Sequence, residues 1–290
     1  MSLAKEGPGD VVDVDQGAVL YEVSSGGVAV LTFNRPDRLN AWAADIAHEF
    51  YARIDAAEAD PEVRVIVITG RGRAFCAGAH MGTVDQVGSL ADGGPVDVDA
   101  AVGERPAHFL LSLRKPVIAA INGACVGIGL THALMCDVRF AASGAKFAVP
   151  FARRGLIAEH GISWILPRIA GPAVARELLL SGRTFLAEEA ADLGLVTALV
   201  PPEELLTHAV TYAEEIASKC SPNSLEVIKR QILTDADGSA DQATARAEVA
   251  MAQSLTRPDV IEGITAFLEK RTPQFPPLSR RERGNGVEHH

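Results

Sequence analysis

Three glycines interrupt an apolar stretch of this chain where its pattern changes from strand to helix. Gly123, Gly127 and Gly129 follow the buried-strand pattern of residues 117–121 and precede the helical pattern of residues 130–135. Glycine tolerates positive φ and lets another backbone or a ligand come close. A helix that begins at such a turn points free N–H groups, backed by the positive end of its dipole, at one spot. This spot is predicted to hold an oxygen with negative charge; the alternative is a tight helix–strand contact without a ligand.

A second glycine-bearing turn follows the most apolar strand of the sequence. Residues 63–69 form a continuous apolar run, which indicates a strand that is buried on both faces. The turn after it, residues 70–80, again consists mostly of small residues and includes Gly78. Two strand–turn–helix units of this kind are the repeat on which the predicted organisation depends.

Glu159 is the candidate for proton transfer. It stands among glycines and small or apolar residues, ahead of a helix that is expected to start near Ile162. Partial removal from water raises the pKa of a carboxylate toward the range that suits a base which must also return its proton. The alternatives are a surface residue or a carboxylate that the helix dipole stabilises by about 0.3–1 kcal/mol. His80 and His160 are candidates to orient Glu159 or to line a pocket, and neither has the spacing of a metal ligand, so no metal is predicted.

Composition and charge exclude several classes of function. The chain has 290 residues, is 48% hydrophobic and carries a net charge of −10, which argues against nucleic acid and anionic membranes as general partners. No apolar run reaches the length of a membrane span, and the N-terminus lacks the pattern of a signal peptide. Three of the four cysteines lie in small apolar surroundings, which suggests free thiols and a cytoplasmic protein.

The remaining pattern predicts a mixed α/β core followed by helices. A hairpin of strands at 20–23 and 28–33 precedes a helix that Asn40 or a neighbour caps and that ends near Ala59. Further predicted elements are helices at 105–113, from 162 and from 184, strands at 138–141, 146–149 and 195–200, and helices from 202 to 270 with breaks at 221–222, 237–238 and 257–258. The expected division is a loose arm (1–17), a core domain (18–201), a helical region (202–272) and a tail (273–290) that ends like a purification tag.

Five segments, taken together, resemble the crotonase (enoyl-CoA hydratase/isomerase) superfamily. They occur in the family's order and spacing, at residues 34–41, 74–79, 116–123, 135–137 and 262–271. The resemblance implies an α/β spiral of ββα units with a C-terminal helical region that trimerises, as a homotrimer or a dimer of trimers. It also implies an acyl-CoA thioester as substrate, with coenzyme A as part of that substrate and no separate cofactor.

The resemblance assigns roles to individual positions. The family's oxyanion hole consists of two backbone N–H groups, which correspond here to Ala79 and Ile128. Ile128 stands where glycine is common, but a backbone donor does not depend on its side chain. Coenzyme A is assigned to Arg38, Leu39, Ala41 and Ala77, with Phe267 and Lys270 from the C-terminal region. The pocket around the acyl group is assigned to His80, Met81, Thr131, Phe151 and His160.

Departures from the family pattern bear on the reaction. Family members that hydrate enoyl-CoA use two glutamates, and Thr131 and Phe151 stand at these positions. Neither transfers a proton as a carboxylate does. Glu159 resembles the acidic residue of members that shift a double bond, so an isomerase with Glu159 as base is the preferred hypothesis. The alternatives are a hydratase or a hydrolase of an acyl-CoA or β-diketone that uses Glu159, and a non-catalytic acyl-CoA-binding protein.

Overall fold

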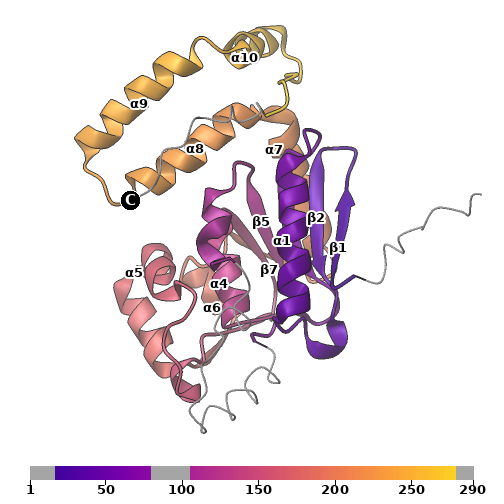
Figure 1. The fold of residues 1–290 in the computed structure, drawn as a ribbon, viewed down its shortest axis with the longest axis vertical. Helices are drawn as coiled ribbons and strands as arrows, with labels where there is room; N and C mark the ends of the chain where they lie inside the picture. Colours follow the sequence, from indigo (N-terminus) through magenta and orange to yellow (C-terminus); the bar gives the residue numbers. More distant parts are fainter. Residues whose placement is uncertain (1–16, 80–104, 279–290) are drawn as a thin grey trace, which may run out of the picture.

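The computed structural model describes residues 17–79 and 105–278, and its largest element is a six-stranded sheet (Figure 1). In this sheet β1 pairs antiparallel with β2, and all other neighbouring strands are parallel. Its strands, in spatial order, are β1 (Val19–Val23), β2 (Val28–Phe33), β3 (Val65–Gly70), β5 (Val117–Ile121), β7 (Val138–Ala142) and β10 (Ala198–Val200). Every residue of β3 is buried, as its apolar run predicts.

A second sheet consists of four three-residue strands. They are, in spatial order, β4 (Ala74–Cys76), β6 (Ala124–Val126), β8 (Lys146–Ala148) and β9 (Thr184–Leu186). The chain passes from β3 to β4, from β5 to β6 and from β7 to β8, and so gives one strand of each pair to each sheet. This repeated winding is the spiral of strand pairs that the sequence predicted.

Two long helices cover the large sheet. Helix α1 (Ala44–Ala59) packs on β1 and β2, and helix α7 (Leu205–Lys219) packs on β2, β3, β5 and β7 (Figure 1). Their buried positions recur every three to four residues, as in an amphipathic helix. The buried side chains include Ile46, Phe50 and Ile54 in α1, and Leu205, Ala209, Ala213 and Ala217 in α7.

Two further helices surround the glycine turns. Helix α4 (Ile128–Met135) follows β6 after a single residue and is buried along its whole length. Helix α5 (Ile162–Ser181) is bent at Gly171, which has φ 82° and precedes Pro172. Shorter elements are the 3₁₀ turns η1 (Pro36–Arg38), η3 (Ala107–Ser112) and η4 (Ala152–Arg154), and helix α6 (Ala187–Asp192).

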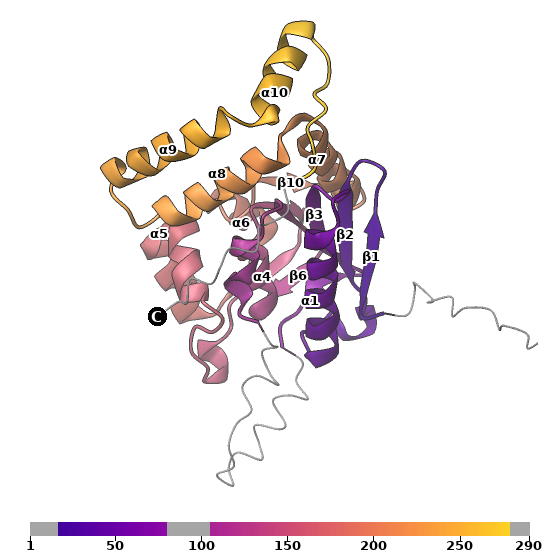
Figure 2. The ribbon, with the colours of Figure 1, turned by 45° about the horizontal axis from the view of Figure 1, so that its top comes forward.

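The C-terminal part is helical, with the breaks that the sequence predicted. It comprises α8 (Pro222–Asp235), α9 (Ala240–Ser254) and α10 (Pro258–Glu269) after α7. Figure 2 shows α9 running alongside α8, with α10 beyond them at the edge of the molecule. Within residues 17–79 and 105–278, none of the helices combines the length and apolarity that crossing a bilayer requires.

Four local predictions were wrong. Helix α1 begins after Ala43, and Asn40 is a buried residue of the preceding turn rather than its cap. The helix predicted at 105–113 is the 3₁₀ turn η3, and the helix predicted from Thr184 begins only at Ala187, because residues 184–186 form β9. The glycine turn holds a strand, β6, between β5 and α4. Tertiary pairing decides such three-residue elements, since they are too short to show a period.

Gly129 allows helix α4 to approach strand β4 closely. A Cβ atom at residue 129 would lie 2.5 Å from the carbonyl oxygen of Cys76 and 2.7 Å from the Cys76 Cβ. Real Cβ atoms do not come this close, so only glycine fits between the two backbones. The absence of a side chain at residue 129 therefore fixes the position of the helix start.

We predict that Gly129→Ala lowers the free energy of unfolding by about 1–3 kcal/mol, the usual cost of overpacking a core. Gly263→Ala is the matched control, because a Cβ at that helical position would lie 3.6 Å from the Phe275 ring, in ordinary contact. The control should be as stable as the parent or more so, since alanine is the better helix former. Urea unfolding followed by circular dichroism measures both, and equal stability of Gly129→Ala and the parent would contradict the prediction.

Candidate active site

The two glycine turns meet at one edge of the small sheet. Strands β4 and β6 are parallel, with Cys76 opposite Cys125, so both turns follow carboxyl ends on the same side. The Cα of Gly78, in the first turn, lies 4.0 Å from the place of a Cβ on Gly127, in the second. The structure thus brings together the residues that directly precede Ala79 and Ile128.

Both predicted donors are free within the part of the chain that the structure describes. Ile128 is the first residue of α4, so its N–H has no acceptor in its own helix. Gly127 before it adopts φ 54° and ψ −120°, a conformation open to glycine. Among the described residues, neither the Ile128 N–H nor the Ala79 N–H donates a hydrogen bond. Two unpaired N–H groups beside a helix N-terminus suit an oxygen that gains negative charge.

The turn assigned to coenzyme A lies against the first glycine turn. The Ala77 N–H donates to the Leu39 carbonyl at 3.1 Å, and the Trp42 N–H donates to the Gly78 carbonyl at 2.7 Å. Four predicted residues, Arg38, Leu39, Ala41 and Ala77, therefore come from two segments that pair with each other. The Arg38 side chain is 62% exposed, which leaves its guanidinium available to a solvent-facing anion.

Asn40 holds this turn in place. Its side-chain amide donates to the carbonyls of Arg71 and Ala74, at 3.0 and 2.7 Å, and its oxygen accepts from the Arg35 N–H at 2.8 Å. Leu39 and Asn40 both have left-handed φ values, 52° and 53°. Such a conformation is unfavourable for leucine and persists only where surrounding contacts impose it. The buried amide of Asn40 supplies those contacts.

Thr131 and Phe151 have places in the site that do not involve proton transfer. The Thr131 hydroxyl is buried and donates back to the Gly127 carbonyl at 3.1 Å. The Phe151 side chain is buried, and its ring lies 3.8 Å from the place of a Cβ on Gly127. Thr131 thus stabilises the Gly127 turn by a hydrogen bond from within helix α4, and Phe151 covers the same turn with an apolar ring.

The Glu159 carboxylate is half-buried and lies beside the ring of His160. Glu159 Oε2 is 3.6 Å from His160 Nε2, and the two side chains are 33% and 10% exposed. Burial raises the pKa of the Glu159 carboxylate and lowers the pKa of the His160 ring. His160 has φ 57°, an unfavourable backbone conformation of the kind that gathers at functional sites.

Sequence reasoning missed His132, which lies deep in α4 one turn after Ile128. Its Nδ1 is 2.9 Å from the Ile128 carbonyl oxygen, and its ring stacks on Trp42 with 4.3 Å between centroids. Burial lowers the pKa of His132 to about 4, and its proximity to His160 contributes. The only sequence signal was a polar ring in an otherwise apolar helix.

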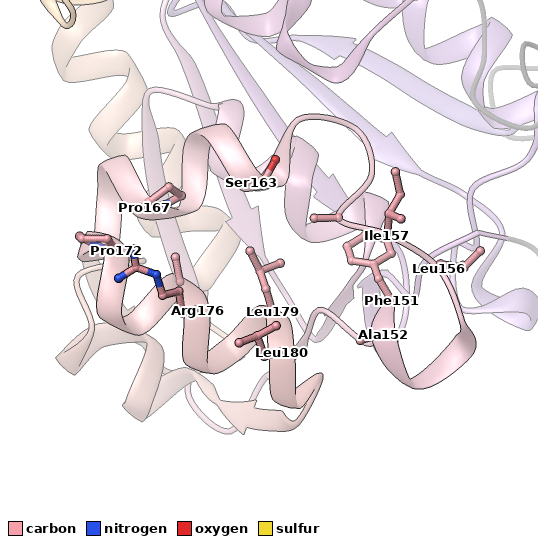
Figure 3. A pocket seen from close by; sticks show the side chains of 12 residues that line it. Phe151, Ala152, Leu156, Ile157, Ser163, Pro167, Pro172, Arg176, Leu179 and Leu180 are labelled. Carbon is pink, nitrogen blue, oxygen red and sulfur yellow. The ribbon is translucent and has the colours of Figure 1, made fainter.

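The Glu159 segment separates two cavities. The larger, about 790 Å³, lies inside the bend of α5 and is walled by Phe151 and Ala158 among others (Figure 3). The smaller, about 330 Å³, is bordered by Met135, Gly161 and Trp164. Ala158 lines the larger cavity and Gly161 borders the smaller one, so the segment that contains Glu159 runs between the two. In the described residues no group of histidine, cysteine and acidic side chains is placed to hold a metal ion.

Phe267 and Lys270 do not lie near the Arg38 turn of their own chain. The segment after α10 is tied to the amino end of β3, where the Arg64 guanidinium donates to the Phe275 carbonyl at 2.8 Å. The glycine turns lie beyond the carboxyl end of β3, roughly 20 Å away for a strand of this length. Both side chains are exposed. His80 and Met81 lie outside the described residues.

Comparisons with known proteins agree with this arrangement. The sequence model of the Enoyl-CoA hydratase/isomerase family matches residues 23–277. A 1,2-epoxyphenylacetyl-CoA isomerase of Escherichia coli is 36% identical over 86% of this chain and 95% of its own length, and a crotonyl-CoA hydratase of Syntrophomonas wolfei is 34% identical over 86% and 94%.

Solved structures give the same result. An enoyl-CoA hydratase from Mycobacterium marinum is 64% identical, with a TM-score of 0.64 over 75% of this chain and 97% of that one. An enoyl-CoA hydratase from Polaromonas is 34% identical, with a TM-score of 0.81 over 89% of this chain and 100% of that one. The fold is therefore that of the crotonase superfamily, and the chain belongs to the enoyl-CoA hydratase/isomerase family.

Proposed function

We propose that this enzyme moves a double bond of an enoyl-CoA from the 3 to the 2 position, with Glu159 as the base. One observation carries the proposal: of the three positions where family members place their acids, only Glu159 has an ionisable side chain. Thr131 uses its hydroxyl to brace Gly127, and Phe151 presents an aromatic ring. The relatives include both an isomerase and a hydratase at nearly equal identity, so the proposal rests on these residues and not on overall similarity.

The proposed reaction needs one carboxylate and two donors. Glu159 takes a proton from C2 of the 3-enoyl thioester, and the electron pair moves toward the carbonyl oxygen. The N–H groups of Ala79 and Ile128 hold this oxygen, which carries the negative charge of the dienolate. The same proton then returns to C4, the double bond forms between C2 and C3, and the carbonyl is restored. The pre-oriented donors supply the largest part of the stabilisation, since loss of one typically costs about 10²–10³ in rate.

Glu159→Gln should bind acyl-CoA about as tightly as the parent and lose turnover by roughly 10²–10⁴, because glutamine keeps size and hydrogen bonding but is no base. A 3-enoyl-CoA, crotonyl-CoA and a saturated acyl-CoA are assayed separately for isomerisation, hydration and hydrolysis. The parent should isomerise the first and hydrate the second only slowly. Glu188→Gln, an exposed glutamate of α6, is the control. Full turnover in Glu159→Gln would remove Glu159 from the mechanism, and binding without any of the three reactions in the parent would favour a non-catalytic acyl-CoA-binding protein.

The rate should fall in acid with a midpoint above 4.5, the ordinary pKa of a glutamate. Burial disfavours the charged carboxylate and raises the pKa of Glu159, so the base becomes protonated at a higher pH than an exposed glutamate would. The pH profile of kcat/KM measures this limb. His160→Asn removes the neighbouring titratable ring and should leave the limb in place. A limb that disappears in His160→Asn would assign it to the histidine instead.

We also propose that the active site is completed by another subunit of a homotrimer or a dimer of trimers. Helix α10 exposes a row of apolar side chains, including Ile261, Ile264, Phe267 and Leu268, which are 57–82% exposed. An apolar face of this kind marks an interaction site. Because Phe267 and Lys270 are remote from their own Arg38 turn, they could reach coenzyme A only in a neighbouring chain.

Light scattering should find particles of three or six chains of 30.6 kDa each. Ile261→Asp combined with Ile264→Asp should shift the mass toward one chain, since two carboxylates would enter an apolar contact. Leu186→Asp, on strand β9 of the small sheet, is the control at an exposed apolar residue outside α10 and should keep the parent's mass. A parent protein that stays monomeric at micromolar concentration would contradict the assembly.

A further inference from the structure

His132 contacts one part of the predicted oxyanion hole directly and is linked to the other part through Trp42. Through Nδ1 it reaches the Ile128 carbonyl, in the first turn of α4, at 2.9 Å. Through its ring face it stacks on Trp42 at 4.3 Å and an interplanar angle of 30°. The backbone of Trp42 in turn pairs with the other turn, because its N–H donates to the Gly78 carbonyl and the residue forms a parallel bridge with Ala79.

The hydrogen bond with Ile128 fixes the protonation of the ring. A carbonyl oxygen only accepts, so Nδ1 carries the proton and donates it, and Nε2 of the neutral ring bears the lone pair. Nε2 is buried and has no hydrogen-bond partner among residues 17–79 and 105–278. Protonation of Nε2 would place a charge in surroundings of aromatic rings, among them Trp42 and Phe50. The ring therefore stays neutral and keeps one orientation.

This arrangement is not the most stable one for the core. A buried acceptor without a partner costs about 1–3 kcal/mol, and an apolar ring of similar size would avoid that cost. Residues that break a rule of stable packing are expected at functional sites. The presence of a histidine at residue 132 is therefore better explained by an effect of its ring on the two donors than by core packing.

We propose that His132 is a positioning residue that clamps the two donor turns together, so that the N–H groups of Ala79 and Ile128 converge on one oxygen. One link is the hydrogen bond to Ile128, and the other is the stack on Trp42, which carries the Gly78–Ala79 turn. The inference rests on the proposed enolate-forming function, and it adds a residue outside the acids and donors already assigned. Misalignment of the donors affects the transition state more than the ground state, since charge on the oxygen develops only there.

Two variants each cut one link. His132→Phe keeps an aromatic ring for Trp42 and removes the N–H, and His132→Asn keeps an N–H donor and removes the ring. Each should lower kcat about tenfold with KM within about twofold, less than the roughly 10²–10³ that complete loss of a donor costs. His132→Phe should be at least as stable to heat as the parent, because it removes the unpaired acceptor. The control His208→Phe changes an exposed ring on α7 that packs on Phe140 and should leave kcat unchanged.

A second measurement does not require turnover. Butyryl-CoA labelled with ¹³C at the thioester carbonyl is bound to each protein, and infrared difference spectra report how strongly the donors polarise that carbonyl. The parent and His208→Phe should lower the carbonyl frequency by the same amount, and both His132 variants should lower it less. This outcome stands even if Glu159 proves not to be the base. A parent-like kcat and carbonyl frequency in His132→Phe would overturn the clamp, as would a loss confined to His132→Asn.

Discussion

The close approach of helix α4 to strand β4 is the contact on which the site depends. Gly129 leaves no side chain between the helix start and the Cys76 backbone, and Gly123 likewise leaves none between β6 and the Arg73 carbonyl. These two glycines allow both β6 and α4 to pack closely against β4. The first N–H of α4 consequently lies beside the turn that follows β4, so Gly78 and Gly127, from distant parts of the sequence, lie side by side.

Several buried side chains around helix α4 and the two glycine turns are uncharged. Cys76 and Cys125 face each other on β4 and β6, and Cys136 follows α4. Burial raises the pKa of Cys76 to about 11 and that of Cys136 to about 12, so both remain neutral thiols near neutral pH. His132 is neutral for the same reason. These buried thiols and this ring, all within the described residues, therefore add no charge of their own beside the glycine turns.

Sequence patterns predicted the elements that have a clear hydrophobic period. They failed for the elements and roles that a tertiary contact determines. The apolar run of β3 identified a buried strand, and Pro222 and Pro258 marked the starts of α8 and α10, because burial and proline act locally. Strand β6 has three residues and no period of its own, so only its pairing with β4 and β8 reveals it. Asn40 has the type of a helix cap, yet its amide bonds to carbonyls more than thirty residues away.

The candidate site shows the same division. The glycine pattern predicted two turns and a helix start, which the structure contains, and the family resemblance then assigned the donor roles to Ala79 and Ile128. The sequence did not predict that Phe267 and Lys270 lie far from Arg38 of the same chain. This distance follows from how α10 and the segment after it lie against the amino end of β3. The sequence did not indicate a role for His132, because its ring stacks on Trp42, a residue that is far away in the sequence.

Thr131 and Phe151 stand where hydratases of the family have two glutamates. They also favour the proposed reaction because they do not support the addition of water. A water molecule that adds to an enoyl-CoA must be held by acceptors next to the donors. Phe151 places a buried ring over Gly127, and the Thr131 hydroxyl is already engaged with the Gly127 carbonyl. Both side chains are buried, and neither carries a carboxylate that could take a proton from a water molecule at the second turn. In the proposed isomerisation, Glu159 is the proton carrier that the described residues offer to the enolate, and returning its proton to C4 needs no further reactant.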